Sequence, residues 1–206
     1  FWFVWKKTIK GKTIKNDIES SHIPIILLTA KNSIDDRIEC YNSGADGYIS
    51  KPFELKLLKA RINSFLENKK EKQQLFKANF RLDLTDLKTP SIDEQFLNNA
   101  ISIIEEHIAE SELDVNILAI KLNISKSTLY RKIKTLTDLS PSDFIRNIKL
   151  KRASIILKDR SVNISEVAYQ CGFSDPKYFS HCFKNEFNMT PSEYQKIQQP
   201  WSSDKA

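Results

Sequence analysis

The chain contains little of what disulfide-bonded, metal-binding or membrane-spanning proteins need. Its three cysteines, Cys40, Cys171 and Cys182, have no paired spacing, which favours reduced core thiols over a disulfide framework or a metal site. The three histidines lie far apart and form no ligand pattern, so we expect no metal ion. The apolar run Phe1 to Trp5 has five residues, against the roughly 20 that cross a bilayer, and we expect a cytoplasmic location.

Patterns of catalytic sites are also missing from the sequence. With only four glycines, the chain has no glycine-rich phosphate loop, and it lacks a nucleophile elbow and a zinc-protease motif. We therefore expect no enzyme, no catalytic residue, no cofactor and no small-molecule substrate.

The C-terminal half contains a helical unit that occurs twice in the sequence. The first copy covers residues 115–144 and the second covers residues 163–194. Leu118 and Ala119 match Val167 and Ala168 at an offset of 49, and the later matches lie at an offset of 50: Leu129 with Phe179, Ile133 with Phe183, Pro141 with Pro191 and Phe144 with Tyr194. One residue has been inserted in the turn. Two short helices joined by a tight turn, repeated after one long helix, suit a protein that presents two reading helices to DNA.

Turn and cap residues support this interpretation. Gly172 can take the positive φ that ends a helix, and Asn123, at the equivalent place, is the next most tolerant residue. Ser125 is expected to cap the first reading helix, and Ser174 or Asp175 the second. Each copy then closes on a hydroxyl cap, a proline and an acid at the third helical position, in Ser140 to Asp143 and in Thr190 to Glu193.

These motifs resemble the AraC-type DNA-binding domain, an all-α fold with two helix-turn-helix units. The resemblance covers about residues 93–199 and rests on A-x-x-x-G-F from Ala168, Y-F-S-H-x-F-K from Tyr178 and T-P-S-E-Y from Thr190. It implies that double-stranded promoter DNA is the ligand and that RNA polymerase is a partner.

Charge is separated along the same region. Residues 93–120 hold seven acids and no Lys or Arg, whereas residues 121–160 hold eleven bases and three acids. The basic stretch covers the first reading helix and the connector, where it can neutralise phosphates. The alternative is that residues 126–134 are only a solvated helix face.

Helical spacing separates core positions from reading positions. In the first reading helix, near residues 126–136, Leu129, Ile133 and Leu136 face the core. In the second, near residues 176–187, Phe179 and Phe183 do so. By resemblance to the family, the base contacts fall to Ser127, Tyr130, Arg131, Lys177, Tyr178 and His181. Phosphate contacts are expected from Lys126, Lys132, Lys134, Ser174 and Lys184. The connector at residues 142–157 would hold the two helices about 34 Å apart, in successive major grooves.

The N-terminal third carries a second signature. The apolar run Ile25 to Leu28 is typical of a parallel strand buried on both faces, and it ends at Thr29. A helix capped near Ser33 is expected to reach about Ser43, and a turn and a second short strand lead to Lys51-Pro52-Phe53. Over residues 20–67 this resembles the final two strands and helices of a response-regulator receiver domain, which has a flavodoxin-like α/β fold.

The resemblance implies roles for four receiver residues. Thr29 would be the switch hydroxyl, Lys51 the phosphate-binding cation, Pro52 a cis proline and Tyr48 the aromatic that moves with the switch. The acceptor aspartate and an acidic pair for Mg²⁺ should come earlier, yet no Asp or Glu precedes Asp17. We therefore expect no phosphoacceptor in this chain, and Mg²⁺ only in a complete receiver. A truncated or frame-shifted receiver is the expectation, and a naturally degenerate receiver is the alternative.

The sequence as a whole predicts a mostly α-helical protein in four parts. These are a partial receiver at residues 1–68, atypical over 1–14, a linker at 69–92, an AraC-type domain at 93–199 and a tail at 200–206. The predicted function is sequence-specific transcription regulation at the output of a two-component phosphorelay, as at the C-terminal end of a hybrid sensor, whose parent chain would be anchored in the inner membrane. A homodimer through the receiver is a further expectation.

Two other classes of protein remain as alternatives. One is a degenerate receiver-linked interaction module that dimerises without binding DNA. The other is an enzyme carrying an AraC-type domain, which would need a reactive cysteine in a setting that none of the three cysteines has.

Overall fold

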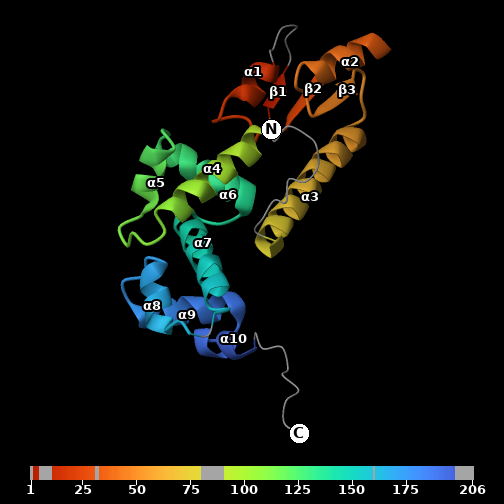
Figure 1. The fold of residues 1–206 in the computed structure, drawn as a ribbon. Helices are drawn as coiled ribbons and strands as arrows, with labels where there is room; N and C mark the ends of the chain where they lie inside the picture. Colours follow the sequence, from red (N-terminus) through yellow and green to blue (C-terminus); the bar gives the residue numbers. More distant parts are fainter. Residues whose placement is uncertain (1, 5–10, 31–32, 80–90, 160, 198–206) are drawn as a thin grey trace. The chain divides into compact units, whose positions relative to one another are not determined.

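The structure, a computed structural model, describes residues 2–4, 11–30, 33–79, 91–159 and 161–197 (Figure 1). The chain divides into two compact units. The first unit consists of Phe1–Leu97 and Arg131–Asp138, and the second consists of Asn98–Tyr130 and Leu139–Ala206. The fold is mostly helical, as expected. No helix among the described residues is both long and apolar enough to cross a membrane.

The first unit contains a parallel three-stranded sheet in the order β1-β2-β3. Its elements are β1 (Trp2–Val4), α1 (Gly11–Asn16), β2 (Ile25–Thr29), α2 (Ile34–Asn42), β3 (Gly47–Ser50) and α3 (Leu55–Asn79). Strand β2, α2 and β3 fall where the sequence predicts them, whereas β1 and α1 were not predicted. Ile25, Ile26 and Ile49 are buried, which explains the continuous apolar run of the central strand.

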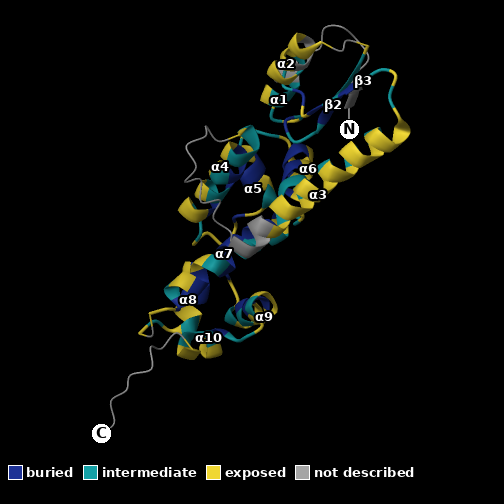
Figure 2. Cartoon of the chain, turned by 90° about the vertical axis from the view of Figure 1, so that its right-hand side faces the viewer, coloured by how far each residue is buried: buried dark blue, intermediate teal, exposed yellow. Residues whose placement is uncertain are grey.

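Helix α3 packs on the sheet through Phe65, and further along the helix Gln73 donates its side-chain amide to Thr135 O at 2.8 Å. A Cβ atom at Gly47 would lie 3.3 Å from the Phe65 ring, so a side chain there would have to displace that ring. The helix extends past residue 68 to Asn79, as expected for a linker that prolongs the last receiver helix. Much of α3 is exposed (Figure 2). Residues 80–90 of the predicted linker and the predicted tail at 200–206 lie outside the described residues.

The remaining helices contain both copies of the repeat. They are α4 (Ile92–Glu106), α5 (Val115–Lys121), α6 (Lys126–Thr137), α7 (Pro141–Ile156), α8 (Ile164–Gln170), α9 (Pro176–Phe187) and α10 (Pro191–Ile197). The long connector α7 contacts α5 of the first copy and α8 and α9 of the second. Its fully buried side chains include Phe144, Ile148 and Ala153, and Leu157 directly after the helix is also buried. The second copy adds an aromatic core in which Phe183 lies 4.5 Å from Phe187 and 5.4 Å from Tyr194 between ring centroids.

Candidate nucleic-acid interface

The first copy forms a helix-turn-helix between α5 and α6. Asp114 caps α5 by accepting hydrogen bonds from the backbone of Asn116 and Ile117 at 2.8 and 2.9 Å. Asn123 takes a φ of 54° in the turn, as its tolerance of that backbone predicts. Ser125 Oγ then accepts the Thr128 amide at 3.1 Å and begins α6, which confirms the predicted cap.

The second copy repeats this turn at an offset of 49. Gly172 has a φ of 69°. Its neighbour Phe173 donates its amide to Ala168 O at 2.9 Å, as Ile124 donates to Ala119 O at 3.1 Å in the first copy. Asp175 caps α9 by accepting the Lys177 amide at 2.9 Å, so the cap is Asp175 rather than Ser174.

Both reading helices also end in the same way. Asp138 and Asn188, 50 residues apart, have φ angles of 62° and 57°. This match was not predicted, although Asn or Asp just past a helix is the signal that indicates it. The predicted caps that follow are confirmed: Ser140 Oγ accepts the Asp143 amide at 3.1 Å, and Thr190 forms a reciprocal pair with Glu193.

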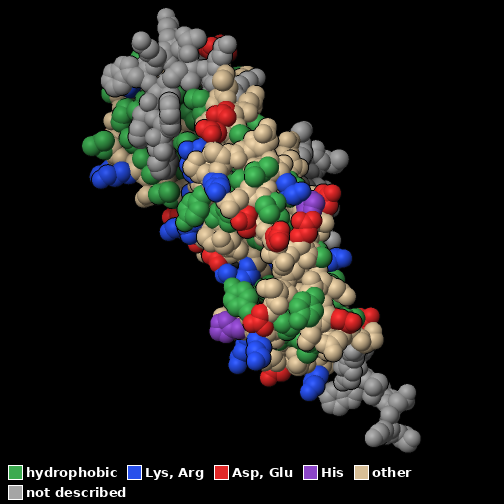
Figure 3. Space-filling model, turned by 90° about the vertical axis from the view of Figure 1, so that its left-hand side faces the viewer, with side chains coloured by type: hydrophobic (Ala, Val, Ile, Leu, Met, Phe, Trp, Pro, Cys, Tyr) green, Lys and Arg blue, Asp and Glu red, His purple; other side chains and the backbone are tan. Residues whose placement is uncertain are grey.

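The two reading helices divide into core and outward faces as predicted. Leu129, Ile133, Phe179 and Phe183 are fully buried, while Leu136 is half-buried. The predicted base-reading side chains are all exposed: Ser127, Tyr130, Arg131, Lys177, Tyr178 and His181. So are four of the five predicted phosphate contacts: Lys126, Lys134, Ser174 and Lys184. In Figure 3, basic side chains, a histidine and apolar side chains lie close together on one face of the second unit.

Lys132 does not lie where a phosphate contact must lie. Its side chain has no exposed surface, and its Nζ lies 2.6 Å from Asp93 Oδ1 and 2.8 Å from Ser21 Oγ. The Phe96 ring centroid is 5.0 Å from the same nitrogen. An ammonium enclosed in this way cannot reach a DNA backbone, so the expected phosphate contact at Lys132 is wrong. Residue 132 follows Thr128 and Leu129 by four and three positions, so it lies on the same face of α6 as these two buried residues.

Arg131 is exposed but already has a partner in the first unit. Its Nη2 donates to Glu19 O at 3.2 Å and lies 3.8 Å from Glu19 Oε2. Both side chains are at least half exposed, so this ion pair contributes little to stability. Lys134 is similar, because its Nζ lies 3.0 Å from the carboxylate of Asp138, the residue that follows α6. Such surface pairs can open to admit a DNA contact.

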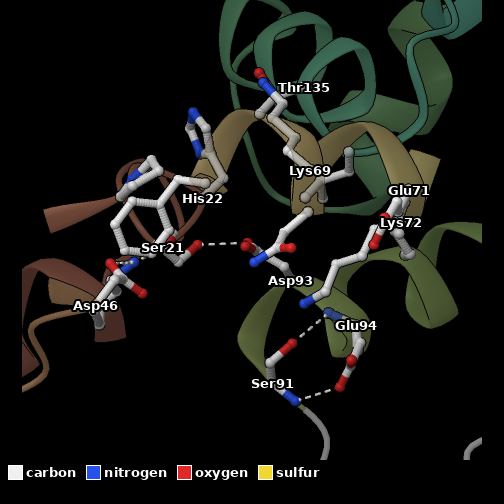
Figure 4. A pocket seen from close by; sticks show the side chains of 16 residues that line it. Ser21, His22, Asp46, Lys69, Glu71, Lys72, Ser91, Asp93, Glu94 and Thr135 are labelled. Atoms are coloured by element: carbon white, nitrogen blue, oxygen red, sulfur yellow. Dashed lines mark hydrogen bonds and ion pairs between the residues drawn. The ribbon is translucent and has the colours of Figure 1, made fainter. Parts of the chain in front are cut away.

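A cavity of about 750 Å³ lies within the first unit (Figure 4). Ser21 donates to Asp93 at 2.7 Å on its wall, and His22 and Lys69 also line it. His22 Nδ1 is buried without a hydrogen-bond partner. Burial, assisted by the charge of Lys132, lowers the pKa of His22 to about 4. Among the described residues, no group of three or more His, Cys, Asp or Glu side chains could hold a metal ion.

Three of the four predicted receiver residues meet at one edge of the sheet. Thr29 and Ser50 are register partners on β2 and β3, and the Lys51 amide donates to Thr29 O at 2.6 Å. The Lys51–Pro52 bond is cis, as the receiver resemblance implies. Tyr48 lies further back on β3, opposite Leu27. The carboxyl ends of the two strands therefore bring the backbones of Thr29, Lys51 and Pro52 together.

Comparisons with known proteins agree with both halves of this architecture. Residues 118–197 match the helix-turn-helix domain family. Residues 7–63 match the response regulator receiver domain family, so the match begins inside the segment that the sequence analysis took as atypical.

The similar proteins include a histidine kinase and a transcriptional activator. The chain is 44% identical over 182 residues to histidine kinase P4 of Formosa agariphila, which is 88% of this chain and 13% of that protein. It is 31% identical over 113 residues to the HTH-type transcriptional activator RhaS of Escherichia coli, covering 52% of this chain and 40% of RhaS. The chain thus spans less than half the length of either relative.

Solved structures resemble about half of the chain. An AraC-type transcriptional regulator from Chromobacterium violaceum has a TM-score of 0.49 and 30% identity, covering 52% of this chain and 96% of that one. The family matches and the repeated geometry together show a segment of the response-regulator receiver type over residues 7–63 and a helix-turn-helix domain of the AraC type over residues 118–197.

Proposed function

We propose that the chain regulates transcription by binding a bipartite DNA site with α6 and α9, at the output of a two-component phosphorelay. The observation that carries this proposal is the repeat of the same turn bonds and caps beneath two exposed helix faces. Arg131 and His181 occupy matching places on these faces, 50 residues apart. Two similar faces on one chain suit two successive major-groove segments.

Different side chains of the two helices have different roles in this proposal. Base contacts come from Ser127, Tyr130 and Arg131 on α6 and from Lys177, Tyr178 and His181 on α9. Arg131 has the geometry for a bidentate contact to guanine. Phosphate contacts come from Lys126, Lys134, Ser174 and Lys184, because these groups are exposed at the rims of the two faces. Lys132 is left out because its ammonium is buried.

Two protein partners belong to the same proposal. RNA polymerase is the partner that a transcription regulator must reach when bound at a promoter. A homodimer would form through the receiver segment, whose helices α2 and α3 expose the apolar side chains of Ile34, Ile38, Tyr41, Leu55, Leu57 and Leu66. Dimerisation would place two copies of the DNA-binding domain on one operator.

Binding-site selection followed by titration of the full chain tests the proposal. Arg131→Ala should weaken binding to the selected site by about 1–3 kcal/mol, or about 5- to 150-fold, and relax preference at one base pair. Lys134→Ala should weaken binding to all DNA sequences by the same factor and reduce the salt dependence of binding. Arg61→Ala, which removes the same charge from an exposed position of α3, is the control and should change neither.

The rival interaction module predicts a different result. Such a protein would show no salt-dependent binding to any selected duplex while still forming dimers. If the full chain selects no sequence from a random library, the DNA-binding proposal fails. If Arg131→Ala keeps both the affinity and the selected sequence, the assignment of the α6 face is wrong although DNA binding stands.

A further inference from the structure

Lys149 lies in the middle of the connector α7 and is buried. Its side chain crosses the second unit, and its Nζ donates to Glu110 O at 3.1 Å and to Gly172 O at 3.2 Å. Glu110 belongs to the turn between α4 and α5, just before the first copy. Gly172 is the turn of the second copy. One ammonium therefore joins the backbone in front of the first helix-turn-helix to the backbone inside the second.

The turn at Gly172 packs closely against the segment between α4 and α5 that contains Glu110. A Cβ atom on Gly172 would lie 2.3 Å from Ile108 O, 2.6 Å from Lys149 Nζ and 3.0 Å from Glu110 O. No side chain fits into this space, and the positive φ of 69° independently favours glycine. The matching residue Asn123 of the first copy is exposed, so the first turn has no comparable contact.

A lysine is a costly way to hold two carbonyl groups together. Neither hydrogen bond goes to a carboxylate, and the Glu110 carboxylate itself pairs with His107 at 2.7 Å. Burial of the ammonium lowers the pKa of Lys149, opposed by Cys171 and Glu110. An apolar side chain would avoid this desolvation. The charge is therefore better explained by the position that it enforces than by stability.

The position of Gly172 controls the start of the second reading helix. Phe173 follows it and packs on Phe179 of α9 with ring centroids 5.2 Å apart. Asp175 caps the helix two residues later. A shift of the Gly172 carbonyl would therefore move the first turn of α9, which carries Lys177 and Tyr178.

We propose that Lys149 is a positioning residue that fixes the second helix-turn-helix against the first, and so sets the spacing that the protein accepts between its two DNA half-sites. This inference rests on the proposed DNA-binding function. Two linked modules gain affinity only when their geometry matches the separation of their sites. Removal of the Lys149 tether should therefore change the choice of spacing rather than the contacts within each half-site.

The test uses the full chain, the selected bipartite site, and copies of that site with one or two base pairs added or removed between the half-sites. The wild type should prefer one spacing by about tenfold. Lys149→Met keeps the length of the side chain but removes the donors, and it should reduce that preference to less than about threefold, with nearly unchanged binding to each half-site alone. Lys149→Arg should restore the preference. Lys158→Met, at an exposed position, is the control.

The outcomes separate this inference from the proposed function. If Lys149→Met binds DNA with the wild-type spacing preference, the positioning role is wrong and the DNA-binding function stands. If it weakens half-site and bipartite binding equally, Lys149 is only structural, and the proposal is also overturned. If the wild type binds neither half-site, both proposals fail. Should Lys149→Met not fold, Lys149→Leu, which also has no hydrogen-bond donor, is judged by the same criteria.

Discussion

The two helix-turn-helix copies share a backbone and differ in what surrounds it. Both close their turns with the same pair of hydrogen bonds, made by Ile124 and Asn123 in one copy and by Phe173 and Gly172 in the other. The first turn is exposed at Asn123, whereas the second leaves no room for a Cβ atom. The repeated sequence thus specifies the local fold, and the neighbours decide how much change each copy tolerates.

The interiors of the two reading helices also differ. Position 132 of α6 is a buried lysine paired with Asp93, and the matching position of α9 is the buried Cys182. The second copy packs Phe179 and Phe183 into an aromatic cluster of its own. The first copy instead needs a carboxylate and a hydroxyl supplied from elsewhere in the first unit. Matching positions in a repeat therefore need not have matching roles.

The largest difference between the copies is expected at the turns. Gly172→Ala should lower the free energy of unfolding by about 3–5 kcal/mol, because positive-φ strain adds to a 2.3 Å overlap with Ile108 O. Asn123→Ala should cost only about 1 kcal/mol, because alanine there has the positive-φ strain but no steric overlap. Urea unfolding of both variants measures the difference. Equal costs would show that the second turn is not enclosed as described.

The buried lysine gives the next largest contrast. Lys132→Met should destabilise the protein by about 2–4 kcal/mol because it leaves Asp93 without its cation, whereas Cys182→Ala should cost about 1 kcal/mol. The double variant Lys132→Met with Asp93→Asn should recover part of the loss. A cost for Lys132→Met below that of Cys182→Ala in chemical unfolding would contradict the paired, buried position.

The reading residues at matching places should differ in DNA recognition. Arg131→Ala removes a side chain that can bond two guanine atoms and should cost about 1–3 kcal/mol, while His181→Ala should cost about 1 kcal/mol or less. Each change should relax a different base pair, and site selection with each variant identifies it. Relaxation of the same base pair by both variants would mean that the two helices do not read separate half-sites.

The helix caps should make the two copies most alike. Ser140→Ala and Thr190→Ala should each cost about 1 kcal/mol of stability at neutral pH. A hydrogen bond from the Ser140 hydroxyl holds the pKa of Asp143 below its usual range, and bonds from the Thr190 backbone and hydroxyl do the same for Glu193; the alanine variants remove the two hydroxyl bonds. A lowered folded-state pKa stabilises the protein above the unfolded value and is lost on acidification, so both costs should shrink below about pH 4. Unfolding curves at pH 7 and near pH 3.5 test this. Costs that do not change with pH would show that the two carboxylates do not contribute to the stability of the caps.

Much of the C-terminal fold could be predicted because its signals act over a few residues. The caps at Ser125, Ser140 and Thr190 and the positive φ at Asn123 and Gly172 depend on neighbours within about one turn. The separation of Leu129 from Arg131 depends only on the helical period. The matching φ angles at Asp138 and Asn188 depend on equally local signals, since Asn and Asp tolerate the left-handed conformation just past a helix.

Other features could not be predicted because they depend on residues far apart in the sequence. In the sequence Lys132 resembles any surface lysine. Its burial depends on contacts with Ser21, 111 residues away, and with Asp93, 39 residues away. Strand β1 forms only because β2 offers it a parallel partner. The sequence by itself determined the two helix-turn-helix units, their outward faces and the receiver signature, since periodicity and capping are local. Only the tertiary structure decided that Lys132 is enclosed and that Lys149 joins the segment before the first copy to the turn of the second, because burial of a charge depends on which distant groups surround it.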